Sequence, residues 1–522
     1  MSRTPQYSFA QFFTTKRLRP TFDFAPDGRA IAYVADYSGY YNLYRQDLDG
    51  GEPRQLTDSQ HLAPNLVVWA PDGYIYFLAD LDGDEQSNLY RIPEGGGEIE
   101  GLTNQPGAQY VSLRLSRDGG ALLYTGNPIT PNESHLFRRD LATGKERLLG
   151  GGPGLWTIGY ESASGRYLTF TQALSRTNVR LHLWDATSGT LRELSEGQPA
   201  ARRQVGPWQG SGETFLFLSD EEGEFSQGFR YDVASASKEP VIAPASDVVV
   251  LFGTKDGRTS AFVTNEHGYF KATLIDPQSG MHLPTPAKLH GGVIDEAALS
   301  PDGSKLALLL NPPNRPAELL VWDRTTNAVT QITDCLQGNL DPAAMVTPER
   351  ITIAGPDHPI PAWLYRPTGL APDQQVPILL SFHGGPEAQE LPTWEPLYQY
   401  LLDLGIAILA PNIRGSNGYG KRYQHLIYRD WGGGDLRDME ACAQWAQAQT
   451  WVKPGKLAVF GASYGGFATL SCATRLPAYW ACAVDFCGPS NLVTLAKTLP
   501  PSFKPRLKGW LGDPEEDRAF LL

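Results

Sequence analysis

Alternating hydrophobic and polar residues dominate the first two-thirds of this 522-residue chain. Short apolar or alternating runs recur after small turns of the Pro-Asp-Gly type, as in "AIAYVAD", "YIYFLAD" and "KLALLL". A second short run follows most of them, for example "NLYRQDL", "NLYRIPE" and "LLVWDRT". Alternation with a period of two residues is typical of β-strands that bury one face. This part of the chain is therefore predicted to be all β.

The turns repeat with a nearly constant period. Their glycines are Gly28, Gly73, Gly119, Gly165, Gly212, Gly257 and Gly303, at successive distances of 45, 46, 46, 47, 45 and 46 residues. A period near 46 with about four short strands per unit is typical of a β-propeller, so seven units predict seven blades. Two β-sandwiches would not keep so constant a period. Trp184 and Trp322, in "LHLWD" and "LLVWD", are interpreted as blade packing, because the Gly-His partner of the WD40 repeat is missing.

The pattern changes near Pro348. "RITIA" and "IPAWLYRP" suggest an antiparallel opening pair, and "VPILLSFH" and "IAILAPN" are continuous apolar runs, as expected for strands buried on both faces. Helical patterns follow in "LYQYLLDLG", where Gly405 is placed to end the helix, and from Asp435 to about Thr450. Strands that alternate with helices predict a parallel α/β sheet.

Composition narrows the class of protein. The chain has 44 Lys+Arg and 57 Asp+Glu, a formal net charge of -13, which argues against nucleic acid as a partner. Hydrophobic residues make up 41%, enough for large cores. The five cysteines have no metal-ligand spacing and are interpreted as reduced thiols. The N-terminus lacks an apolar signal region and no run of about 18 apolar residues occurs, so we expect a cytoplasmic protein without a membrane span.

Two motifs imitate binding sites. Asp80, Asp82 and Asp84 have calcium-loop spacing, but Glu85 stands where that loop needs glycine, so a solvated hairpin tip is expected. The glycines of "WGGGD" (432–434) lack the Gly-Lys-Ser/Thr end of a phosphate loop, and a loop leading into a helix is expected. We therefore expect neither a cofactor nor a metal.

Ser463 lies in "LAVFGASYGGFATL", between an apolar run and a helical pattern. Gly-x-Ser-x-Gly between a buried strand and a helix is the nucleophile elbow of α/β-hydrolases. The turn raises the serine hydroxyl above the sheet, and Gly461 and Gly465 keep Cβ atoms away where strand and helix nearly touch. The helix N-terminus offers free N–H groups to a developing oxyanion.

The partner of this elbow is "SFHGGPE", at the end of another buried strand. This is where the fold places its second oxyanion donor, although a Gly-rich turn of this kind also occurs without function. We expect the backbone N–H groups of Gly385 and Tyr464 to converge on the oxyanion. His383 is not expected to be the base, because the catalytic histidine of this fold follows the serine in chain order.

The three motifs "HGGP", "NIRGSNGYG" (412–420) and "GASYGGF" (461–467), after a seven-bladed propeller, resemble the prolyl oligopeptidase family of serine peptidases. The histidine before the glycines most resembles the acylaminoacyl-peptidase branch. The resemblance implies Ser463 as nucleophile, with Tyr464 and Gly385 forming the oxyanion hole. It also implies that the propeller screens substrates by size and admits short peptides to a site between the domains. The expected division is an N-terminal segment 1–18 that packs as a short helix on the second domain, a propeller 19–345 and an α/β-hydrolase domain 346–522.

The family places an Asp and then a His after the serine, yet the nine histidines of this chain end at His425. Asp485 is too close behind Ser463 and is expected in the next strand, and the acids around Asp513 are expected in a solvated turn. No triad member other than the serine is assigned. We expect a shortened chain (a cloned fragment, a gene fragment or a frameshifted reading frame) that ends its sheet in an unpaired apolar edge and has negligible activity.

The remaining candidates keep their alternatives. Arg414 either binds a substrate carbonyl or carboxylate or braces its loop by a salt bridge. Asp435 and Asp438 are expected on the exposed face and first turn of their helix. Three functions remain: a serine peptidase of acylaminoacyl or dipeptidyl type, a non-catalytic peptide-binding protein, and a carboxylesterase. The partner is a short peptide in the first two, and a homo-oligomer is left open.

Overall fold

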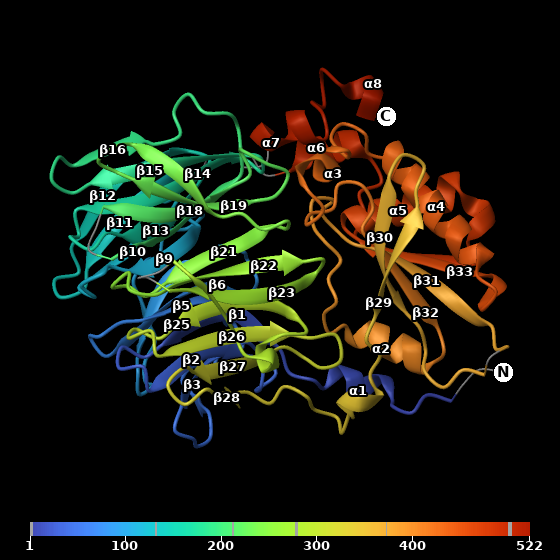
Figure 1. Cartoon of the computed structure of the whole chain (residues 1–522), viewed down its shortest axis with the longest axis horizontal. Helices are drawn as coiled ribbons and strands as arrows, with labels where there is room; N and C mark the ends of the chain where they lie inside the picture. Colours follow the sequence, from blue (N-terminus) through green and yellow to red (C-terminus); the bar gives the residue numbers. More distant parts are fainter. Residues whose placement is uncertain are drawn as a thin grey trace.

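A computed structural model describes residues 4–130, 133–210, 213–276, 280–371, 373–499 and 504–521. Two domains lie beside each other in Figure 1: a ring of β-sheets built from the first two-thirds of the chain, and an α/β domain built from the rest. Seven sheets have four strands each and one sheet has six. The predicted fold class, a seven-bladed β-propeller followed by an α/β-hydrolase domain, is thereby confirmed.

Each blade consists of four consecutive antiparallel strands. The strands of blades one to four are β1 (Leu18–Phe24), β2 (Ala30–Ala35), β3 (Asn42–Asp47), β4 (Arg54–Gln55); β5 (Leu62–Trp69), β6 (Tyr74–Leu81), β7 (Asn88–Pro93), β8 (Glu100–Gly101); β9 (Tyr110–Leu115), β10 (Ala121–Gly126), β11 (Glu133–Asp140), β12 (Glu146–Pro153); β13 (Leu155–Glu161), β14 (Tyr167–Ser175), β15 (Asn178–Asp185) and β16 (Thr190–Glu193).

The other three blades follow the same order. Their strands are β17 (Arg203–Trp208), β18 (Thr214–Ser219), β19 (Gln227–Asp232), β20 (Ser237–Ile242); β21 (Val248–Gly253), β22 (Ser260–Glu266), β23 (Tyr269–Ile275), β24 (His282–Pro284); β25 (Val293–Leu299), β26 (Lys305–Asn311), β27 (Glu318–Asp323) and β28 (Ala328–Gln331). A 3-10 helix, η1 (Ala287–Leu289), connects blades six and seven, and η2 (Pro342–Ala344) follows the last blade.

The repeated turns join the first strand of each blade to the second. The six predicted turn glycines that lie in the described residues all have φ between 68° and 85°, the left-handed conformation that glycine adopts without strain; Gly212 lies outside the described residues. Trp184 and Trp322 are buried in blade cores, as predicted. Asp80 lies near the end of β6, and Asp82 and Asp84 lie in the hairpin tip between β6 and β7.

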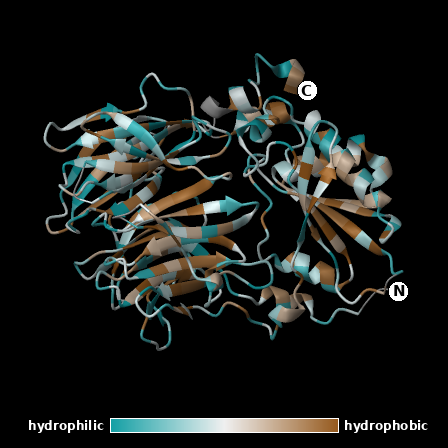
Figure 2. Ribbon diagram, viewed as in Figure 1, coloured by the Kyte–Doolittle hydropathy of each residue, from teal (hydrophilic) through white to brown (hydrophobic). Residues whose placement is uncertain are grey.

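The ring closes by side-chain packing. Because every sheet is made of consecutive strands, no strand is shared between the first and last blades. Instead, Phe22 and Phe24 of β1 pack in one cluster with Ala307 and Leu309 of β26. Hydrophobic residues concentrate in the blade strands and in the central strands of the six-stranded sheet (Figure 2).

The six-stranded sheet has the order β29-β30-β32-β31-β33-β34, and its strands from β32 to β34 are parallel. The elements of this domain are β29 (Glu349–Ala354), β30 (Pro359–Tyr365), β31 (Val376–Phe382), α2 (Pro396–Asp403), β32 (Ala407–Pro411), α3 (Lys421–His425), α4 (Gly434–Ala448), β33 (Val452–Ala462), α5 (Tyr464–Arg475), η3 (Pro477–Tyr479), β34 (Cys482–Phe486), α6 (Leu492–Thr498), α7 (Lys504–Trp510) and α8 (Arg518–Leu521).

Strand β32 shows why the apolar runs are continuous. Ala407 and Leu409 face the core that contains α4, while Ile408 and Ala410 face the core that contains α2. Both faces of the strand are therefore buried, and neither needs polar residues. Gly405 ends α2 with φ 85°, as predicted.

The N-terminal segment crosses to the second domain. Helix α1 (Phe9–Phe13) lies beside α2 in Figure 1, and the ring of Phe9 packs edge-on against that of Tyr400 at 5.2 Å between centroids. The N–H of Lys16 donates to the carbonyl of Cys335, so the two chain segments that join the domains lie together. Within the described residues, no helix combines the length and the apolar character needed to cross a bilayer.

Candidate active site

Ser463 occupies the sharp turn between β33 and α5. Its backbone has φ 58° and ψ -120°, a conformation that non-glycine residues rarely adopt. Its N–H donates to the Phe486 carbonyl at 3.0 Å, and its carbonyl accepts from the Phe467 N–H at 3.0 Å. The serine is solvent-exposed, so its hydroxyl is open to a substrate. The geometry is that of a nucleophile elbow.

The two glycines of the elbow have no room for a side chain. A Cβ on Gly461 would lie 2.2 Å from the Gly465 carbonyl oxygen, and a Cβ on Gly465 would lie 2.0 Å from the Phe382 carbonyl oxygen. Strand β33, helix α5 and the end of β31 therefore meet backbone to backbone. This close approach brings the loop after β31 next to Ser463.

That loop, residues 383–390, is called the oxyanion loop below. A Cβ added to Gly384 would lie 3.6 Å from the Ser463 Cβ, so the loop and the elbow adjoin. Gly385 has φ 124° and is followed by a cis peptide bond to Pro386. Within the described residues, the structure records no acceptor for the N–H of Gly385 or of Tyr464. Both amides remain available to an oxyanion.

His383 is held by the oxyanion loop and by the loop after β32. Its Nδ1 lies 2.7 Å from the Gly384 carbonyl and its Nε2 lies 2.8 Å from the Ser416 hydroxyl. Burial lowers the pKa of His383, which favours the neutral ring. Because both ring nitrogens have partners other than Ser463, His383 serves to fix the loop.

Tyr464 contributes its backbone to the site and its side chain to the core. The phenol is buried and donates to the Asp435 carboxylate at 2.7 Å, and its ring packs edge-on against Trp431. Burial raises the pKa of Asp435. The prediction that Asp435 and Asp438 are exposed is wrong, because both are fully buried where α4 meets the site loops.

Asp438 is buried because it binds Arg414. It accepts from the Arg414 backbone N–H at 3.0 Å, from Nε at 2.9 Å and from Nη2 at 2.8 Å. Nη2 also donates to Asp357 at 2.9 Å, and this hydrogen bond lowers the pKa of Asp357. Arg414 is 4% exposed. Of its two expected roles, this geometry corresponds to bracing the loop by a salt bridge.

The recorded partners of the acidic residues after Ser463 are groups other than Ser463. Asp485 lies in β34, and its carboxylate accepts from the Gly488 N–H at 2.9 Å. Asp513 accepts from the N–H groups of Glu515 and Glu516 in a turn, as predicted. Strand β34 is the outermost strand of the described sheet, and its Val484 and Phe486 are 54% and 66% exposed.

Sequence reasoning missed two residues next to the site. The Glu387 side chain, two positions after Gly385, is 1% exposed and forms an ion pair with Arg176 of the propeller at 3.3 Å. Gln424 and Tyr428 donate to the same carboxylate. Glu387 is visible in "HGGPE", but nothing in the sequence marks Arg176, which lies 211 residues earlier in the turn between β14 and β15.

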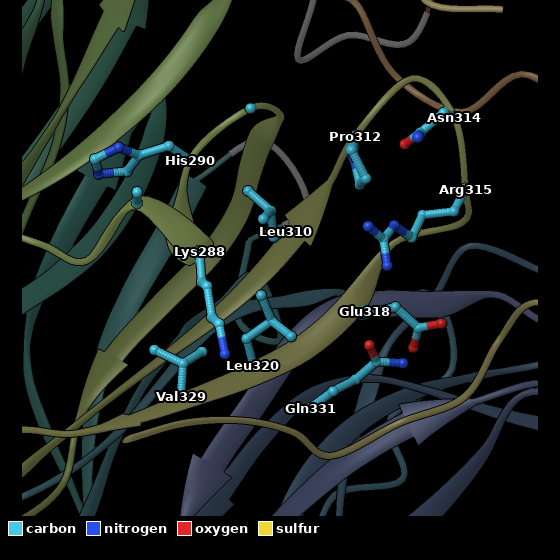
Figure 3. Close-up of a pocket in the computed structure, with 12 residues that line it drawn as sticks. Lys288, His290, Leu310, Pro312, Asn314, Arg315, Glu318, Leu320, Val329 and Gln331 are labelled. Atoms are coloured by element: carbon cyan, nitrogen blue, oxygen red, sulfur yellow. The ribbon is translucent and has the colours of Figure 1, made fainter. Parts of the chain in front are cut away.

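A separate hollow lies on the seventh blade. Figure 3 shows Lys288 and Arg315 beside it, with Leu310, Leu320 and Val329 along its floor, and its volume is about 470 Å³. All its lining residues belong to the segment 287–331 of the propeller. This hollow is therefore distinct from the elbow at Ser463.

Comparison with known families and sequences assigns both domains. Residues 394–520 match the prolyl oligopeptidase family, and residues 10–132 match the dipeptidyl peptidase IV N-terminal region. The chain is 26% identical over 517 residues to dipeptidyl aminopeptidase BIII of Pseudoxanthomonas mexicana, covering 96% of this chain and 74% of that protein. It is 34% identical over 545 residues to dipeptidyl peptidase family member 6 of Caenorhabditis elegans, covering 94% and 70%.

Solved structures share the fold over nearly the whole chain. A puromycin-hydrolyzing peptidase of Mycobacterium tuberculosis superposes with a TM-score of 0.85 at 20% identity, covering 99% of this chain and 85% of that one. An acylaminoacyl peptidase of Pyrococcus horikoshii superposes with a TM-score of 0.72 at 16% identity, covering 98% and 84%. The chain belongs to the prolyl oligopeptidase family of serine peptidases.

Proposed function

We propose that this peptidase acts on short peptides and releases dipeptides or acylated residues through an acyl-enzyme on Ser463. The observation that carries the proposal is the elbow itself: an exposed serine with φ 58°, beside two N–H groups for which the described part of the chain records no acceptor. Relatives described as a dipeptidyl aminopeptidase and a dipeptidyl peptidase favour dipeptides as the released group.

In the proposed reaction, the Ser463 hydroxyl oxygen attacks the scissile carbonyl carbon. The carbonyl oxygen becomes an oxyanion that accepts hydrogen bonds from the N–H groups of Gly385 and Tyr464, next to the N-terminus of α5. The hydroxyl proton passes to a base in the solvent as the C–O bond forms. Collapse of the intermediate then breaks the C–N bond, and the leaving amine takes up a proton from the solvent. Water then attacks the acyl-enzyme in a second step of the same kind.

The proton of Ser463 needs an acceptor in the first step. No histidine follows Ser463 in the sequence, and His383 is bound to Gly384 and Ser416. We propose that acylation by the 522-residue chain is slow, limited to the roughly 10³–10⁴-fold acceleration that an oxyanion hole and binding provide without a base.

The position of the site supports a role for the propeller in selecting substrates by size. The oxyanion loop contacts the tip of the β14–β15 hairpin through Arg176 and strand β22 through Asn265. A peptide at Ser463 therefore lies beside the propeller, and a large folded protein would collide with the blades.

Labelling of the full chain with a fluorophosphonate probe, followed by mapping of the modified residue, tests the nucleophile. We expect slow modification of Ser463 that imidazole, as an external base, accelerates by about tenfold or more, because a general base contributes about 10²–10⁴-fold. Ser463→Ala is the matched control and should take no label. Modification of a different residue would place the nucleophile elsewhere, and fast labelling without imidazole would reveal a base within the chain.

The substrate class is tested in the same imidazole buffer. We expect turnover of dipeptidyl amides with a free amino end to exceed turnover of simple esters of similar size. The reverse order would favour a carboxylesterase, and neither activity should survive in Ser463→Ala.

A further inference from the structure

The oxyanion loop is held by the propeller as well as by its own domain. Arg176, at the tip of the β14–β15 hairpin, pairs with the Glu387 carboxylate, and its Nη1 donates to the Glu387 carbonyl at 3.3 Å. Asn265 of β22 donates from Nδ2 to the Gln389 side chain at 2.6 Å. The hairpin formed by β22 and β23 extends toward the second domain in Figure 1. Two propeller side chains therefore reach residues two and four positions after Gly385.

Glu387 connects these contacts to the oxyanion amide. A Cβ placed on Gly385 would lie 2.8 Å from the Glu387 nitrogen, so the turn between the two residues is tight and leaves little space for movement. On the other side, Gln424 Nε2 donates to the Glu387 carboxylate at 2.7 Å, and the Tyr428 hydroxyl donates to the same oxygen. We therefore expect a displacement of the Glu387 backbone to shift Gly385 as well.

Charge makes Arg176 the critical partner. The Glu387 side chain is 1% exposed, and its other recorded partners, Gln424 and Tyr428, are neutral. A buried carboxylate that loses its cationic partner is unfavourable in a protein interior, so without Arg176 the Glu387 side chain moves toward water. This movement loosens the turn that contains Gly385.

We infer that Arg176 is a positioning residue that couples docking of the propeller to the geometry of the oxyanion hole. This inference rests on the proposed function, in which the Gly385 N–H binds the oxyanion. Within the described residues, the recorded polar partner of Arg176 is Glu387, so Arg176 acts through Glu387. The propeller then does more than exclude large substrates, because the oxyanion hole is complete only while Arg176 of the β14–β15 hairpin contacts Glu387.

Hydrogen exchange on the full chain tests the inference without requiring activity. In Arg176→Ala we expect exchange of the amides in residues 383–390 to rise by about tenfold or more, while exchange in α5 is unchanged. Arg176→Lys keeps the charge and should restore part of the protection. Equal exchange of the loop in wild type and Arg176→Ala would overturn the inference.

Arg180→Ala is the matched control. Arg180 lies on the neighbouring strand β15, has the same 43% side-chain exposure as Arg176, and pairs with Glu193 inside its own blade. It should leave exchange in residues 383–390 at the wild-type rate. Equal acceleration in both variants would indicate general loosening of blade four and would also overturn the inference.

Fluorophosphonate labelling of Ser463 in imidazole is the second readout. Loss of one oxyanion donor lowers rates by about 10²–10³-fold, so a displaced donor in Arg176→Ala should slow labelling by about tenfold or more, with no change in Arg180→Ala. Unchanged labelling in a variant whose loop exchange has risen would show that Gly385 is not the donor. If wild-type Ser463 takes no label, the proposed function fails, while the exchange experiment still decides whether Arg176 positions the loop.

Discussion

The backbone of Ser463 is held in place by its neighbours. A non-glycine residue in such a conformation costs about 1–3 kcal/mol unless the surrounding structure fixes it. Hydrogen bonds to Phe486 on one side and Phe467 on the other supply that restraint. The glycines at 461 and 465 let three backbone segments meet beneath the serine. Conformation at single residues thus creates the exposed hydroxyl.

Gly465→Ala separates helix propensity from packing. Alanine is favoured over glycine inside a helix by about 1 kcal/mol, which alone would stabilise α5. The added Cβ, however, would lie 2.0 Å from the Phe382 carbonyl oxygen, and overpacking of this kind costs about 1–3 kcal/mol or more. We expect a net loss in the free energy of unfolding, measured by urea denaturation.

The control for this change is Gly95→Ala, because a Cβ on Gly95 meets nothing within 4 Å. It should leave the denaturation midpoint close to that of wild type. A Gly465→Ala protein as stable as Gly95→Ala would contradict the backbone contact at the elbow.

At the scale of elements, α4 connects the helix of the elbow, α5, with the loop after β32. Its Asp435 binds the phenol of Tyr464, which begins α5, and its Asp438 binds Arg414 in the loop after β32. Both carboxylates are fully buried. Helix α4 therefore fixes the elbow helix and the neighbouring loop through charges that have no access to water.

Breaking the buried pair should be costly. Arg414→Ala leaves Asp438 buried without the cation that binds it, and removal of one partner of such a pair typically costs about 3–5 kcal/mol. The matched control is Arg437→Ala on α4, the helix that carries Asp438. The Arg437 side chain is 55% exposed and pairs with Asp357 at 3.3 Å. An exposed pair contributes about 0–1 kcal/mol. Chemical denaturation monitored at the hydrolase tryptophans measures the difference, and equal losses would contradict the buried pair.

At the scale of the whole molecule, the two domains are joined where the last blade ends. Glu318 of β27 is 4% exposed and binds the segment that leaves the last blade. Its carboxylate accepts hydrogen bonds from the Thr333 hydroxyl at 2.5 Å and from the Cys335 N–H at 2.7 Å. Burial raises the pKa of Glu318 to about 7. The N-terminal segment lies beside this connecting segment, and the Lys16 N–H donates a hydrogen bond to the Cys335 carbonyl.

This carboxylate makes stability depend on pH with a definite sign. In the unfolded chain Glu318 ionises above its ordinary pKa of 4.5, whereas in the folded protein it keeps its proton up to about pH 7. Its contribution to the free energy of unfolding is therefore largest below pH 4.5 and falls as the pH rises to about 7, by a total of about 3 kcal/mol.

Denaturation of wild type and Glu318→Gln at pH 5 and pH 8 measures this effect. Glutamine keeps a carbonyl acceptor but does not titrate. The stability of Glu318→Gln relative to wild type should therefore increase from pH 5 to pH 8, because only wild type loses this contribution. A constant difference between the two proteins would show that Glu318 titrates normally in the fold.

Much of the architecture can be predicted from local patterns, because strand alternation, turn glycines and continuous apolar runs report burial along the chain itself. The seven blades, the α/β sheet, the elbow at Ser463 and the family follow from such patterns. The oxyanion role of Gly385 and Tyr464 and the screening of substrates by size remain predictions that the labelling and exchange experiments test.

What the sequence alone determined about this protein is therefore the order of its elements and the position of the elbow at Ser463, since both depend on residues close together in the chain. Only the tertiary structure decided that Asp435 and Asp438 are buried, that Arg414 braces a loop, and that Arg176 pairs with Glu387 across 211 residues. The physical reason is that a charged residue can be buried wherever folding brings it an opposite charge or a hydrogen-bond donor, and distant segments supply those partners.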